Sequence, residues 1–156
     1  MLDLLLYHDC YAPLAAAIAV VLNLKPASML ALRTAQLESL AESARLSFKA
    51  RLHSHLARFF PEHCSKLGAE RIDLAIDFAI RRAGLYGIES EHGICVYADI
   101  MFAFGHLFEE APEHAWAARV LRDPNIFDPA IRVERLYEEA MNFLRQREAT
   151  RSTPGR

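Results

Sequence analysis

The chain has 156 residues, of which 53% are hydrophobic and 24% are charged, with a formal net charge of −2. This composition excludes a disordered chain, and the length suffices for one domain with a core. The basic residues are dispersed, so we expect no nucleic-acid partner. Three scattered cysteines, Cys10, Cys64 and Cys95, form no CxxC pair, which favours reduced thiols and a cytoplasmic location.

Residues 1–28 differ from the rest of the chain. Their uninterrupted apolar part, 10–24, is shorter than the roughly 20 residues that span a bilayer, and no Lys or Arg precedes Lys25 as in a secretory signal. We therefore favour an extra apolar helix, or translation that begins at Met29, over a membrane anchor. Of these two we prefer the start at Met29. The predicted domain spans 29–148, followed by a disordered tail, 149–156.

Two helices are predicted in the first half of this domain. The first spans about 30–60, with an apolar stripe at three- and four-residue spacing, and Pro61 ends it. The second spans about 69–83, where Leu74 and Phe78 widen the apolar surface, so we expect it to be covered on more than one side. The stripe of the first helix consists of Leu37, Leu40, Ala44, Phe48, Leu52, Leu56 and Phe59.

The segment 84–108 predicts a tight turn followed by a central helix. Gly84 and Gly87 suit the end of the second helix, and Ser90 is a good N-cap for the third. This third helix is apolar around most of its circumference, as expected for a helix enclosed by neighbours. Gly105 lies in its apolar run, which predicts the close approach of another helix.

Two more helices complete the prediction. A short one spans about 114–121, and Asp128-Pro129 supplies an N-cap and a first-turn proline for a last one. The chain shows no sustained period-two alternation. We therefore predict an all-α fold, an irregular bundle of four to five helices in a single domain.

The strongest candidate for a site lies on the third helix. His92, Cys95, Asp99 and His106 are spaced by three, four and seven residues, so they share roughly one face and could bind a metal. Because no complete ligand set at a recognised spacing is present, we favour a polar strip and predict no metal and no cofactor.

Asp99 lies in the most apolar stretch, and a buried carboxylate must be paired or hydrogen-bonded. If Asp99 is buried, we expect a structural pair that fixes the helix register rather than a catalytic role. Its candidate partners are Arg81, Arg82 and Arg119.

No catalytic residue is predicted. His53 and His55 are two apart and point to different faces of a helix, and His63-Cys64 follows Pro61 in what we expect to be a loop. The chain has no GxSxG, P-loop or dinucleotide motif, so we expect no enzyme. The glutamates of the polar break after Phe108 are expected to be solvated. They are Glu109, Glu110 and Glu113.

Three runs resemble a family of small uncharacterised bacterial proteins encoded near type VI secretion spike and effector genes. They are RLHSHLARFFPEHCSKLG, AIRRAGLYGIESEHGICVYADIMFAFG and HAWAARVLRDP, and the resemblance covers about 37–144. The matching positions are typical of fold-forming rather than catalytic residues. The resemblance implies an accessory role: an adaptor, chaperone or immunity partner that binds an effector or spike component. The alternative from the residues is a small metal- or ligand-binding helical protein.

Overall fold

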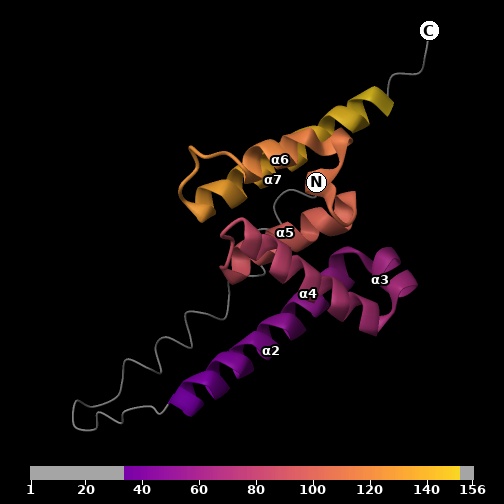
Figure 1. Cartoon of the computed structure of the whole chain (residues 1–156). Coiled ribbons are helices and arrows are strands. Elements are labelled where there is room, and N and C mark those ends of the chain that lie inside the picture. Colours follow the sequence, from indigo (N-terminus) through magenta and orange to yellow (C-terminus); the bar gives the residue numbers. More distant parts are fainter. Residues whose placement is uncertain (1–33, 152–156) are drawn as a thin grey trace, which may run out of the picture. The chain divides into compact units, whose positions relative to one another are not determined.

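The computed structural model describes residues 34–151, and these residues form helices and no strand (Figure 1). The all-α prediction is therefore confirmed. The predicted count of four to five helices is slightly too low, since six α-helices and two short 3₁₀ helices lie in this range. Residues 1–33 and 152–156, including the predicted extension, lie outside the described residues.

The described part of the chain divides into two compact units, residues 34–52 and residues 53–151. The boundary falls inside the first described helix, α2 (Thr34–Phe59), which ends just before Pro61 as predicted. In the first unit Phe48 and Leu52 are buried, but Leu37 and Leu40 are more than half exposed, so the predicted stripe is buried only in part.

The second unit continues with α3 (Pro61–Leu67) and α4 (Ala69–Leu85). Our expectation of a loop around His63 was wrong, because Pro61 at the first helical position starts a new helix. Leu74 of α4 is 67% exposed, so this helix is not covered on that side. Its buried stripe consists of Ile72, Ala75, Ile76, Ala79 and Ala83.

The turn after α4 is a Schellman motif. The amide of Ile88 donates to the carbonyl of Ala83, and the amide of Gly87 donates to that of Gly84. Gly87 has a φ of +73°, the left-handed conformation that this motif requires. The adjacent helix α5 (Glu91–Phe104) begins with Ser90, whose side chain accepts from the amide of Gly93, which confirms the predicted N-cap.

Helix α5 packs against α4 and α7 (Pro129–Arg151), and eight of its 14 residues are buried, which confirms the predicted covered helix. The residue that permits close packing is Gly93, and the prediction for Gly105 was wrong. A Cβ atom on Gly93 would lie 2.6 Å from a methyl group of Ile88 and 3.1 Å from one of Val133.

Gly105 instead ends α5. Its φ is +101°, and a Cβ atom there would meet nothing within 4 Å. Phe108 therefore lies outside α5, in the 3₁₀ helix η1 (Phe108–Glu110).

The remaining elements are η2 (Pro112–His114), α6 (Ala115–Leu121) and α7. Helices α6 and α7 run alongside each other (Figure 1). The side chain of Asp128 accepts from the amide of Ala130, which confirms the predicted start of α7. This helix extends to Arg151, so residues 149–151 of the predicted disordered tail are helical. No helix among residues 34–151 combines the length and hydrophobicity needed to cross a membrane.

Two glycines should respond in opposite ways to alanine. Gly84 lies in the last turn of α4, where a Cβ atom would meet no other atom within 4 Å, so Gly84→Ala should stabilise the protein by about 0.5–1 kcal/mol. Gly105→Ala forces a side chain into the left-handed region and should destabilise by about 1–3 kcal/mol. Urea unfolding of both variants measures the two changes. Equal effects would contradict the backbone assignment of Gly105.

Candidate functional site

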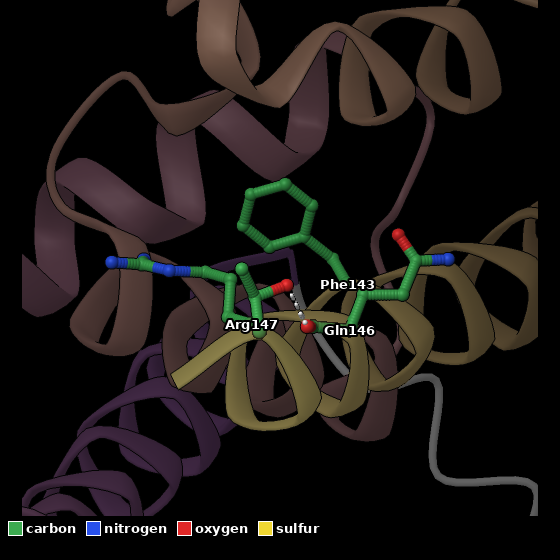
Figure 2. A pocket seen from close by; sticks show the side chains of 4 residues that line it. Phe143, Gln146 and Arg147 are labelled. Carbon is green, nitrogen blue, oxygen red and sulfur yellow. Dashed lines mark hydrogen bonds between the residues drawn. The ribbon is translucent and has the colours of Figure 1, made fainter. Parts of the chain in front are cut away.

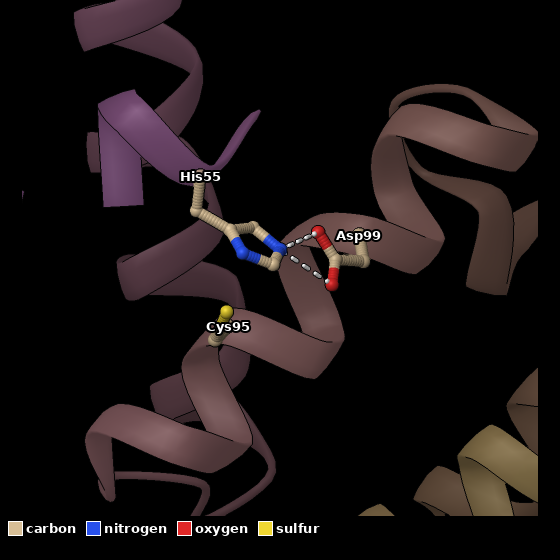
Figure 3. A group of neighbouring side chains, drawn as sticks. All are labelled: His55, Cys95 and Asp99. Carbon is tan, nitrogen blue, oxygen red and sulfur yellow. Dashed lines mark hydrogen bonds and ion pairs between the residues drawn. The ribbon is translucent and has the colours of Figure 1, made fainter. Parts of the chain in front are cut away.

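Three side chains with metal-binding donor atoms meet between α2 and α5 (Figure 3). Asp99 and Cys95 are four residues apart, so they lie on the same face of α5 one turn from each other. His55 comes from the last two turns of α2. One donor atom from each residue lies within 4.8 Å of the other two. We call these residues the His55–Cys95–Asp99 cluster.

The cluster contains a close histidine–carboxylate pair. Nε2 of His55 lies 2.9 and 3.0 Å from the two carboxylate oxygens of Asp99. The two side chains are 7% and 17% exposed, and the ring of Phe59 packs 4.6 Å from the imidazole. Burial raises the pKa of Asp99, and the hydrogen bond from His55 opposes this effect. Because the partner is a histidine, the three arginine partners predicted for Asp99 were wrong.

The structure joins only two of the four predicted ligands. Cys95 and Asp99 belong to the cluster, whereas His92 and His106 do not. Helix α5 ends at Phe104, so His106 leaves the shared face and packs against the ring of Phe78 instead. His55 is the residue that sequence reasoning missed. Its spacing of three from Leu52 and four from Phe59 places it on the buried face of α2. The sequence therefore already indicated that His55 is buried.

The other histidine and cysteine residues considered from the sequence, His53, His63 and Cys64, lie apart from this cluster. His53 contacts Asp73 at 2.9 Å near the surface. Burial raises the pKa of the Cys64 thiol, whereas a nucleophilic cysteine has a lowered pKa, and the neighbouring His63 is exposed. The raised pKa therefore does not favour a nucleophilic role for Cys64.

A second buried polar cluster joins α4, α5 and η1. The Oε1 atom of Glu109 accepts from the Tyr97 hydroxyl at 2.8 Å and from Nε and Nη2 of Arg82 at 2.8 and 2.5 Å. Glu109 is only 1% exposed, so the expectation of a solvated side chain was wrong. Its second oxygen is buried without a partner among the described residues. Glu110 also accepts from Arg82 but is 47% exposed.

Tyr97 gives this cluster a pH dependence. Burial and the neighbouring Glu109 carboxylate raise the pKa of the phenol well above its ordinary value of 10.0. The unfolded chain therefore releases this proton near pH 10 while the folded chain keeps it, and stability falls as the pH rises above about 10. We expect the slope to approach about 1.4 kcal/mol per pH unit.

Tyr97→Phe removes this titration. Unfolding of wild type and variant in urea from about pH 8 to 11 should show that the stability advantage of the wild type shrinks above pH 10. A constant difference would contradict the raised pKa.

Figure 2 shows a hollow whose described lining residues include no cysteine, histidine or carboxylate. It has a volume of about 400 Å³, and its described lining residues all belong to α7. The Thr150 hydroxyl donates to the carbonyl of Gln146, and the Arg147 guanidinium lies 5.9 Å from the ring centre of Phe143. A second hollow, of about 370 Å³, is lined by side chains of both charges from α6 and α7 and from the segment that joins them. They are Arg119, Val120, Asp123, Ile126, Arg135, Glu138 and Glu139.

In comparisons with known proteins, no family model, no curated protein and no solved structure matches the chain.

Proposed function

We propose that the chain is a non-enzymatic accessory protein that binds another protein, as an adaptor, chaperone or immunity partner of a type VI secretion effector or spike component. The resemblance of 37–144 to proteins encoded near such genes supplies the class of partner. We place this binding in the cytoplasm, where scattered cysteines stay reduced.

The observation that carries the binding role is the exposure of Phe127, which reaches 89%. Exposed aromatic side chains often carry a large share of interface energy. Two further apolar side chains, Leu85 and Ile131, are 71% and 47% exposed. Ile131 lies four residues after Phe127, near the start of α7. We call Leu85, Phe127 and Ile131 the exposed apolar set.

The backbone around this set is held in place by Arg132. Its guanidinium donates to the carbonyl of Tyr86, next to Leu85, and to the carbonyl of Ile126, next to Phe127. The α4–α5 turn and the α6–α7 connection are therefore tied to the same side chain. In that connection, the amide of Asn125 also donates to the Asp123 side chain. A side chain presented on ordered backbone loses little conformational entropy when it binds, which favours affinity.

Co-purification with an effector or spike protein encoded by a neighbouring gene tests the proposal. We expect capture by the wild type and at least tenfold weaker binding by Phe127→Ser, a loss of about 1.4 kcal/mol or more. Leu74→Ser is the matched control, because Leu74 is also an exposed apolar residue but lies in the second turn of α4. A chain that captures no such neighbour, with secretion and toxicity unchanged on deletion, would overturn the proposal.

A further inference from the structure

We infer that the His55–Cys95–Asp99 cluster is a binding site for a divalent transition-metal ion, with Zn²⁺ as the best-matched ion. This site is independent of the exposed apolar set. It supplies three protein ligands and leaves further coordination positions for water or another ligand, as in zinc sites that are not purely structural.

The spacing of the donor atoms is close to what a tetrahedral ion needs. With zinc–nitrogen and zinc–oxygen bonds of about 2.1 Å and a zinc–sulfur bond of about 2.3 Å, neighbouring ligand atoms lie about 3.4–3.6 Å apart. Nε2 of His55 and the Asp99 oxygens are at 2.9 and 3.0 Å, so they would separate slightly. The remaining two separations, both to the sulfur of Cys95, are at most 4.8 Å, so they would close by at most about 1.2 Å.

Helices α2 and α5 hold the three candidate ligands in a partly fixed arrangement. Ligands four residues apart on one helix face the same ion, as in other helical zinc sites, and Cys95 and Asp99 have this spacing. The third ligand, His55, reaches across from α2, with its ring packed against Phe59. A purely structural His55–Asp99 pair requires no thiol. Cys95 within 4.8 Å adds a third donor of the type that zinc favours.

The chemistry of the donor set selects the ion. Imidazole and thiolate suit zinc and other late transition metals, whereas Mg²⁺ and Ca²⁺ prefer oxygen ligands alone. Thiolate, carboxylate and neutral imidazole carry a combined charge of −2, so one Zn²⁺ makes the buried site neutral. Binding releases the thiol proton of Cys95 to solvent, together with any proton that the His55–Asp99 pair holds between Nε2 and the carboxylate. A neutral site in a buried location avoids the cost of an uncompensated charge.

Titration with Co²⁺, which occupies zinc sites and is coloured, tests the inference on the full chain purified without a histidine tag and treated with a chelator. We expect one Co²⁺ per chain, with a sulfur-to-cobalt charge-transfer band and the intense visible absorption of a four-coordinate ion. Zn²⁺ should displace Co²⁺ and remove both signals. Zn²⁺ should also raise the melting temperature in a concentration-dependent way, because a ligand that binds only the folded state stabilises it.

Variants separate this site from the other cysteine and histidines. Cys95→Ser should lose the charge-transfer band, and Asp99→Asn should weaken Co²⁺ binding at least about 100-fold, since loss of a second-shell partner alone costs 10–100-fold. Cys64→Ser is the matched control, because Cys64 is also buried but outside the cluster, and it should keep the band. His92→Ala should also keep it.

The inference fails if the wild type shows no charge-transfer band and no Zn²⁺-dependent rise in melting temperature. It also fails if the band survives Cys95→Ser or disappears in Cys64→Ser. If Cys95→Ser does not fold, as judged by circular dichroism, the wild-type stoichiometry and the Asp99→Asn and Cys64→Ser titrations decide the question.

Discussion

Glu109→Ala is expected to lower the free energy of unfolding by about 3–5 kcal/mol, because it removes one partner of a buried ion pair. The variant leaves Arg82, whose side chain is 18% exposed, without its main acceptor, and it leaves the buried Tyr97 hydroxyl without its carboxylate partner. Truncation of this buried side chain also leaves a cavity. Unfolding in urea, followed by circular dichroism, measures the loss.

Glu110→Ala provides the matched control for this variant. It removes the neighbouring glutamate, which binds the same Nη2 atom of Arg82 at 2.6 Å but is 47% exposed. Exposed ion pairs contribute about 0–1 kcal/mol, so the effect should be small. Similar losses in the two variants would contradict the buried position of Glu109.

Phe108→Ala is expected to cost about 3–5 kcal/mol through lost burial and the cavity that remains. Phe108 is 1% exposed, and its ring centre lies 5.2 Å from that of Tyr97 and 6.4 Å from that of Trp116. The ring of Phe108, carried by a 3₁₀ helix of three residues, therefore packs between residues of α5 and α6. The loss is measured from the midpoint and slope of the urea transition.

Phe127→Ala is the control for Phe108→Ala, since both replace a phenylalanine that lies outside the α-helices. Phe127 is 89% exposed, so its removal should change the free energy of unfolding by less than about 0.5 kcal/mol. This result would also separate a binding defect in Phe127 variants from a folding defect. A large loss of stability would instead show that the Phe127 side chain packs against the rest of the protein, which would contradict its exposure.

The predicted start and covered character of α5 were confirmed because their evidence is local. The apolar circumference of 94–102 predicts a covered helix, and Ser90 predicts its first turn, since an N-cap acts on amides two or three residues away. The start of α7 at Asp128-Pro129 depends on the same kind of short-range signal. These features could be predicted from the sequence because each depends on neighbours within one or two turns.

The prediction for Gly105 failed because a sequence does not distinguish two physical roles of glycine. Close approach of a neighbour and a left-handed backbone both select against a Cβ atom. The roles fall to different residues here: Gly93 faces Val133 across the helix contact, and Gly105 ends α5 at a φ of +101°. Only the backbone conformation and the neighbours of each glycine in the folded chain distinguish the two roles.

The sequence by itself determined the all-α class and the N-caps Ser90 and Asp128, and it named Cys95 and Asp99 as two candidate ligands. Only the tertiary structure decided the partners of the buried charges. Asp99 is paired with a histidine 44 positions earlier in the chain, and Glu109 with an arginine 27 positions earlier. Helical periodicity reports which side chains of one helix share a face, but it carries no information on which face of another helix packs there. The pairing of charges is set by that packing, because a buried charge must be satisfied by whichever side chain the fold brings to it.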